Sequence, residues 1–87
     1  MALYNLVLDK QVRKKDFPKI PAKQRPRIVK LIEALQTNPR PPAAQKLTNR
    51  QEYRMRSGVY RILYVIDDKK RSVTVRTIRH RGEVYKK

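Results

Sequence analysis

The strongest constraint on the fold of this chain is a change in hydrophobic periodicity after Leu47. Beyond it the period becomes two: apolar and polar side chains alternate over residues 53–56 and 72–78, and residues 59–66 are rich in the β-branched and aromatic residues that strands favour. The residues between these segments, Ser57-Gly58 and the polar run 67–70, are typical of turns. Consecutive strands joined by short turns predict a three-stranded antiparallel meander.

The first part of the chain alternates less clearly. Residues 3–9 are apolar enough for a mostly buried strand. Residues 10–17 favour a short helix, which Pro18 and Pro21 interrupt because proline cannot continue the backbone hydrogen bonds of a helix. The proline-rich stretch 38–44 indicates a loop.

Between Pro21 and this loop the spacing predicts a second helix. Apolar side chains recur every three or four residues, at Ile28, Leu31, Ile32 and Leu35. Pro26 fits its first turn, where a missing N–H costs nothing. The expected order is β-α-α-β-β-β, an α+β fold of two layers with a helical pair packed on one face of a mainly antiparallel four-stranded sheet. The 87 residues suit a single domain spanning 1–87.

Charge narrows the class of partner. The chain has 23 Lys and Arg residues against 7 acidic ones, a formal net charge of +16, so its natural partners are polyanions. This composition fits a nuclease and a non-catalytic basic binder about equally well. The N-terminal apolar run is too short for a membrane span and lacks the basic leader of a signal peptide, so we expect a soluble, cytoplasmic protein.

The residue inventory excludes several catalytic devices. The sequence has no cysteine, which removes thiol nucleophiles and disulfides. Asp67 and Asp68 are the only adjacent acids, and as neighbours beside a turn they should point apart as solvated turn residues, so a two-metal nuclease is not expected. His80 is the single histidine, and Ser57 and Ser72 have no evident triad partners. We therefore expect no metal and no cofactor.

Arginine and tyrosine on the predicted strands point to nucleic acid. The arginines are Arg54, Arg56, Arg61, Arg76, Arg79 and Arg81, and the tyrosines among them are Tyr60, Tyr64 and Tyr85. A guanidinium binds a phosphate through two parallel hydrogen bonds, and a tyrosine ring offers a face on which an unpaired base stacks. Without a metal, the economical reaction at such a site is attack by the 2′-hydroxyl of RNA on the neighbouring phosphate, which excludes DNA as substrate.

Several segments together resemble the C-terminal half of RelE-type toxins, in the RelE/ParE superfamily. They are Lys46-Leu47, Tyr53-Arg-Met-Arg56, Gly58-Val-Tyr-Arg-Ile-Leu-Tyr64, Ile78-Arg-His-Arg81 and Glu83-Val-Tyr85. The order of predicted elements fits that family over essentially the whole chain. The resemblance implies the toxin of a type II toxin–antitoxin system, a ribosome-dependent ribonuclease that cuts messenger RNA in the A site. It also implies an acidic RelB-like antitoxin as partner, in a hetero-oligomer.

The resemblance assigns roles to three residues directly. Arg61 matches the family's phosphate-stabilising arginine, Arg81 its arginine near the leaving group, and Tyr85 its stacking tyrosine. Arg61 also stands inside an otherwise apolar strand, where an unpaired charge is costly. Tyr60 and Tyr64 continue the alternation of that strand and are expected to be packing residues.

The chain departs from the family at the proton acceptor. Arg54 and Arg56 stand where RelE-type toxins have lysines, and a guanidinium with a pKa above about 12 is a very poor general base. Both remain candidates for catalysis or for phosphate binding alone. His80 is a candidate acid or base, although strand alternation turns it away from Arg81, and Lys46 is another possible base. The residues expected to bind RNA are Lys46, Arg54, Arg56, Arg76 and Arg79.

Two other functions stay open. A ParE-like toxin has the same fold and inhibits DNA gyrase without cutting RNA, but it has no use for arginines and a tyrosine arranged around a scissile phosphate. A basic RNA-binding or ribosome-binding module without turnover would share the charge. In that case Arg61→Ala would weaken binding in proportion to any loss of activity.

Overall fold

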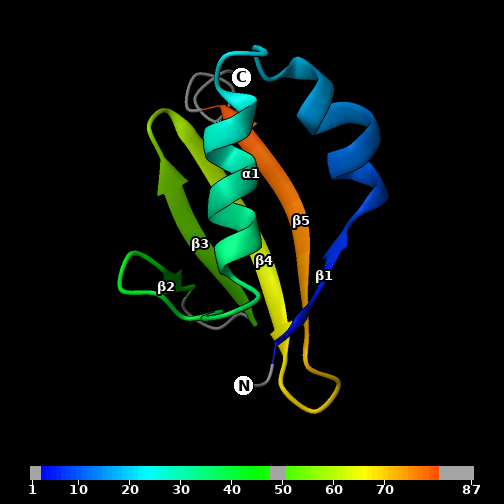
Figure 1. Ribbon diagram of the computed structural model, residues 1–87, viewed down its shortest axis with the longest axis vertical. Coiled ribbons are helices and arrows are strands. Elements are labelled where there is room, and N and C mark those ends of the chain that lie inside the picture. The colour runs from blue at the N-terminus through cyan, green and yellow to red at the C-terminus, as the bar shows by residue number, and fades with distance from the viewer. Residues whose placement is uncertain (1–2, 48–50, 81–87) are drawn as a thin grey trace.

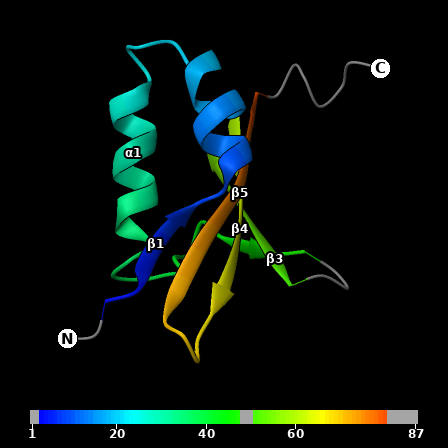
Figure 2. The same cartoon turned by 90° about the vertical axis from the view of Figure 1, so that its right-hand side faces the viewer.

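The computed structural model describes residues 3–47 and 51–80, and Figure 1 shows their arrangement. The elements, in chain order, are β1 (Asn5–Leu8), η1 (Val12–Asp16), η2 (Phe17–Lys19), α1 (Arg25–Ala34), β2 (Gln45–Lys46), β3 (Glu52–Ser57), β4 (Tyr60–Asp67) and β5 (Ser72–His80). All helical elements lie on one face of the sheet (Figure 2). The predicted two-layer α+β fold is therefore confirmed.

The sheet has five strands rather than the four expected, in the order β1-β5-β4-β3-β2. Strands β3, β4 and β5 form the predicted antiparallel meander, and β1 joins β5 in parallel. The additional strand is β2, in which Gln45 pairs with Arg54 and Lys46 with Tyr53. Two residues are too few to produce a periodic pattern, so only the pairing reveals this strand.

Helix α1 covers the sheet as its spacing predicts. Pro26 lies in the first turn, Ile28 and Ile32 are buried, and Leu35 is buried just beyond the last turn. Their partners on the sheet are Met55, Tyr60, Ile62, Tyr64, Val73, Val75 and Ile78. Tyr60 and Tyr64 are thus packing residues, as expected. No helix within 3–47 or 51–80 is long and apolar enough to cross a membrane.

The short helix expected over residues 10–17 is a π-helical turn, η1, that continues into a 3₁₀ turn, η2. The Phe17 N–H donates to the Val12 carbonyl, an i to i+5 hydrogen bond that widens the turn. Val12 and Asp16, four residues apart, both face the interior. Pro18 sits in the 3₁₀ turn, where the helix changes pitch before it ends at Lys19.

A polar cluster at the turn between β4 and β5 links three segments of the chain. The Arg40 guanidinium donates two hydrogen bonds to the Asp68 carboxylate, at 2.8 and 3.3 Å, and the Tyr4 hydroxyl donates to the same carboxylate at 2.7 Å. Arg40 and Tyr4 hold the pKa of Asp68 below its usual value. Asp68 is exposed, as expected of a turn residue, but it links three segments rather than only facing solvent. Asp67 accepts from the Lys70 N–H within its own turn.

Candidate nucleic-acid interface

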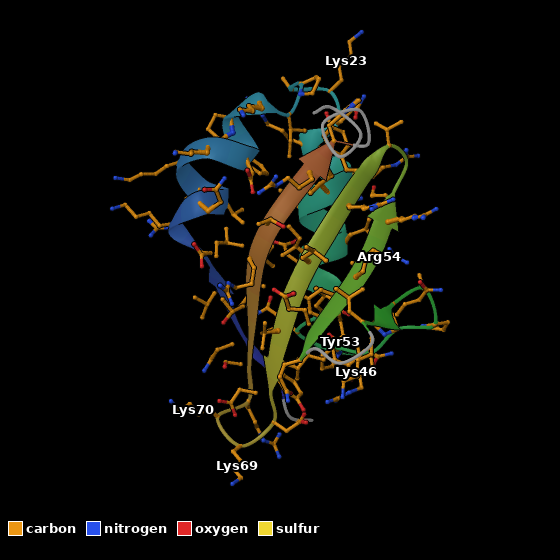
Figure 3. All side chains as sticks on the ribbon, turned by 180° about the vertical axis from the view of Figure 1, so that it is seen from behind. Lys23, Lys46, Tyr53, Arg54, Lys69 and Lys70 are labelled. Carbon is orange, nitrogen blue, oxygen red and sulfur yellow. The ribbon has the colours of Figure 1, made fainter. Side chains whose placement is uncertain are left out.

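The helices cover one face of the sheet, and the alternation of side chains along β4 shows which residues lie on the other, open face. Tyr60, Ile62 and Tyr64 are buried under the helices, so the residues between them project to the opposite side. Arg61 and Leu63 are therefore on this open face, which we call the outer face. Figure 3 looks onto it, with Arg54 labelled on β3.

Three arginines form a continuous row across the outer face. Arg56 on β3 is the cross-strand partner of Arg61 on β4, and Arg61 is the partner of Arg79 on β5. Directly opposed residues in an antiparallel pair share a face, with Cβ atoms about 5 Å apart. Within the part of the chain that the structure describes, none of the three guanidinium groups has an ion pair or hydrogen bond. We call Arg56, Arg61 and Arg79 the arginine row.

Arg54 extends this positive surface by one step along β3. Its partner is Leu63, two residues from Arg61 on β4, and its guanidinium donates to Gln45 Oε1 at 2.8 Å. The side chains of Arg54, Arg56, Gln45 and Ala43 line an open hollow of about 320 Å³ at the β2 edge. This hydrogen bond to Gln45 orients Arg54 beside the arginine row.

A β-bulge in β5 brings Arg79 to the outer face. Leu63 pairs with Thr77 but Tyr64 pairs with Val75, so Arg76 is an extra residue in β5. Val75 faces the core, and without the bulge Thr77 and Arg79 would face it too. The inserted residue shifts the alternation, so that Ile78 is buried and Arg79 points outward. Arg76 itself forms an ion pair with Asp9, Nε to Oδ2 at 3.4 Å, away from the row.

The structure does not bring His80 to the arginine row. His80 is the cross-strand partner of Tyr60, and the two rings meet edge to face with centroids 5.3 Å apart. Tyr60 is only 6% exposed and faces the helices, so His80 lies on the opposite side of the sheet from Arg61.

Lys46 is also separate from the row. It pairs with Tyr53, whose ring stacks on the buried ring of Tyr64 at 5.7 Å, so Lys46 lies on the helix side of the β2 edge. Arg81 and Tyr85, the two remaining predicted site residues, lie outside the described residues. No group of three or more His, Cys, Asp or Glu side chains that could hold a metal ion occurs within 3–47 and 51–80.

A small basic domain with helices on one face of a mixed sheet and arginines across the other matches a known class of toxin. The family model of the ParE toxin of type II toxin–antitoxin systems, parDE, matches residues 7–85. The chain belongs to the RelE/ParE superfamily of these toxins. No curated protein sequence matches the chain.

Solved structures support the same family. The RelBE2 toxin–antitoxin complex of Mycobacterium tuberculosis is 26% identical with a TM-score of 0.79, and the match covers 91% of this chain and 99% of that one. The isolated RelE toxin of E. coli is 26% identical with a TM-score of 0.77, covering 94% and 90%. The intact E. coli RelBE complex is 26% identical with a TM-score of 0.72, covering 86% and 93%.

Proposed function

We propose that this toxin is a ribosome-dependent endoribonuclease that cuts messenger RNA in the A site without a metal ion. The observation that carries this proposal is the arginine row, three guanidinium groups from three adjacent strands on an open sheet face. A toxin that acts only by binding another protein has no need of such a row. The similarity to solved RelE toxins supports the same function.

The energetics of the row favour a bound phosphate. Like charges directly opposite each other on neighbouring strands destabilise a sheet. Arg61 stands between Arg56 and Arg79 and therefore contributes two such repulsive pairs. A phosphate placed over Arg61 would neutralise this repulsion and accept hydrogen bonds from the guanidinium groups. Because the phosphate gains negative charge as the 2′-oxygen attacks, the same groups stabilise the transition state more than the ground state.

The reaction needs proton transfers that the row cannot perform. The 2′-hydroxyl loses a proton as its oxygen bonds to phosphorus, the bond to the 5′-oxygen breaks, and that oxygen gains a proton. The products are a 2′,3′-cyclic phosphate and a free 5′-hydroxyl. We assign Arg54, Arg56, Arg61 and Arg79 to phosphate binding and charge stabilisation, because arginine stays protonated. The family resemblance assigns Arg81 to the leaving group and Tyr85 to stacking on a base.

Among the described residues, no candidate proton acceptor lies beside the arginine row. His80 and Lys46 are the candidate bases, and both lie on the helix side of the sheet, away from Arg61. His80 would have to leave its contact with Tyr60 and turn around the end of β5 to take part. We infer that the ribosome supplies or completes the acid–base groups. This gives a physical reason why cleavage would depend on the ribosome.

We also propose an acidic, RelB-like antitoxin as the partner that restrains the toxin. The similar structures of M. tuberculosis RelBE2 and of intact E. coli RelBE are toxin–antitoxin complexes. The formal charge of +16 favours fast, salt-sensitive association with an acidic chain. An apolar groove of about 320 Å³ offers a place for its apolar side chains. Its lining residues are Leu6, Leu8, Val12, Arg13, Phe17, Val29, Ile32 and Glu33.

The decisive experiment is primer extension on a messenger in a reconstituted translation reaction. Wild-type protein should produce cuts within codons at the A site, and Arg61→Ala should abolish them while retaining most ribosome binding. Arg27→Ala, which removes one exposed charge from α1 on the other side of the molecule, is the matched control and should cut normally. An intact messenger with normal elongation would refute the nuclease.

A gyrase inhibitor is the second candidate, because the matching family model is that of the ParE toxin. It predicts inhibition of DNA supercoiling by purified gyrase, with messenger RNA left uncut. A supercoiling assay with wild-type protein and Arg61→Ala separates the two. Inhibition that persists in Arg61→Ala would favour the ParE-like function.

A further inference from the structure

Asp16 is a buried carboxylate whose two oxygens both accept hydrogen bonds. It is 6% exposed. Its Oδ2 accepts a hydrogen bond from the backbone N–H of Ile78 at 2.9 Å, and its Oδ1 accepts one from the Gln11 side-chain amide at 2.9 Å. The bond to Ile78 joins η1 to β5 across 62 residues of sequence. Ile78 immediately precedes Arg79 in β5, so this bond lies next to the arginine row.

The edge of β5 needs this bond because β1 is shorter than β5. Pairing between the two strands ends at Leu8 and Val75, and the Asp9 N–H makes one further bond to the Val75 carbonyl at 2.9 Å. Past this point no strand from the described part of the chain lies beside β5 on that edge. A buried N–H without a partner would cost about 1–3 kcal/mol, so Asp16 supplies the acceptor that β1 cannot. Asp16 is one of the two buried residues of η1.

Two contacts from residues 9–16 thus reach β5, one at the bulge and one just beyond it. Asp9 pairs with Arg76, the extra residue, at 3.4 Å, and Asp16 holds Ile78 two residues later. The bulge is the feature that turns Arg79 to the outer face. If the end of β5 slipped by one residue, each side chain in it would move to the other face, and Arg79 would leave the row.

We propose that Asp16 is a positioning residue for the candidate active site: by holding the Ile78 N–H, it fixes the bulged end of β5 and keeps Arg79 beside Arg61. This inference rests on the proposed nuclease function. Asp16 itself lies on the helix side of the sheet and does not touch the phosphate. A carboxylate suits the role because hydrogen bonds to a charged acceptor are shorter and stronger than those to a neutral one.

The test compares three variants under conditions in which each is fully folded. Asp16→Ala removes both hydrogen bonds. Asp16→Asn keeps an oxygen for Ile78, and Gln11 can rotate its amide to match. Val12→Ala, the control, removes buried packing from the same turn and leaves the hydrogen bonds intact. Positioning predicts that Asp16→Ala lowers the single-turnover cleavage rate at saturating ribosome by about tenfold or more, that Asp16→Asn recovers most of it, and that Val12→Ala stays within about twofold.

A second readout does not depend on cleavage. Amide hydrogen exchange should show lost protection at Ile78 in Asp16→Ala but not in Val12→Ala. Addition of inorganic phosphate should shift the Nε–H resonance of Arg79 in wild-type protein and much less in Asp16→Ala. Equal cleavage rates in Asp16→Ala and Val12→Ala, or an unchanged Arg79 response to phosphate, would overturn the inference. If wild-type protein does not cleave, the proposed function fails, and the Arg79 response alone decides the role of Asp16.

Discussion

Arg61 and Arg79 are cross-strand partners on β4 and β5, with both side chains on the open face of the sheet. Arg56 opposes Arg61 from the other side. A sheet that faces only water gains nothing from three like charges in one line, since each opposed pair costs stability. The arginines of the row should therefore favour phosphate binding and at the same time lower the folding stability of the free toxin, and both effects can be measured.

Removing the central arginine should stabilise the free toxin at low salt. Arg61→Ala eliminates both repulsive pairs, and the expected gain is up to about 1 kcal/mol for each pair. Thermal unfolding should show a higher Tm for Arg61→Ala than for wild type, with a difference that shrinks as salt is added. Inorganic phosphate should raise the Tm of wild type more than that of the variant. A lower Tm at low salt would mean that Arg61 is held by attractive contacts instead.

Arg79 and Arg76 should differ in their contribution to RNA binding, although only three positions separate them. Arg79 belongs to the row, whereas Arg76 is paired with Asp9 at the bulge. For a short single-stranded RNA, Arg79→Ala should weaken binding and reduce the slope of log Kd against log salt concentration by about 0.7, the value for one phosphate contact. Arg76→Ala should change both much less. Fluorescence anisotropy over a salt series measures the two, and equal effects would show that binding follows total charge rather than the row.

His80 should be dispensable for the chemical step if it stays against Tyr60. Its position on the helix side of the sheet predicts that His80→Ala cleaves within about threefold of wild type in single-turnover reactions. A general acid or base typically contributes a factor of about 100 or more. A loss of that size, with binding retained, would show that the end of β5 turns when RNA binds and that His80 takes part in proton transfer.

The buried hydroxyl of Tyr64 should make stability fall in alkali. Burial raises the pKa of Tyr64 to about 12, while in the unfolded chain it is about 10. The folded state therefore keeps a proton that the unfolded state loses between these values, and Tyr64 should lower the stability by about 1.4 kcal/mol for each pH unit in this range. Tyr64→Phe loses the hydrogen bond to the Pro39 carbonyl and should be less stable at neutral pH. Its deficit relative to wild type should narrow from pH 10 to 12 in chemical denaturation, and a constant deficit would contradict this.

Asp68 should make the folded protein less stable as the pH falls into the acid range. Hydrogen bonds from Arg40 and Tyr4 lower the pKa of Asp68, so the folded state favours its charged form. The stabilisation is present above the unfolded value of about 3.9 and is lost as the pH falls through the folded value. Asp68→Asn should be less stable than wild type at pH 7, with the gap closing in acid. Asp67→Asn, which removes a negative charge from the same turn and keeps an oxygen for the Lys70 N–H, controls for the change in net charge. A gap between Asp68→Asn and wild type that stays constant in acid would contradict the prediction.

Local patterns were enough to predict most of the elements. The period of two after Leu47 predicts β3, β4 and β5, and the spacing from Ile28 to Leu35 predicts α1, because each of these elements buries one face of its own sequence. Strand β2 could not be predicted, since its two residues have no period. The hydrogen bond from the Phe17 N–H to the Val12 carbonyl that widens η1 leaves no pattern in the sequence, so a short helix could be predicted there but not its pitch.

The candidate site was predictable in its chemistry but less so in its geometry. Alternation alone places Arg54, Arg56 and Arg61 on one face. It fails for Arg79, because the bulge at Arg76 reverses the alternation and is held by Asp16, far away in the sequence. The separation of His80 from Arg61 follows from the same bulge. Contacts between distant segments, such as Arg40 with Asp68, leave no local pattern to find.

The position of β5 in the sheet has a consequence for the order of events during synthesis. This strand is the last of the described strands to leave the ribosome, yet it lies between β1, the first to emerge, and β4. Strand β1 must wait for a partner from the opposite end of the domain, because parallel pairing with β5 is its only place in the sheet. Arg79 likewise joins Arg56 and Arg61 only when β5 has docked. The arginine row therefore forms only after the four other described strands have left the ribosome, and a chain cut short before β5 would carry Arg56 and Arg61 without their third member.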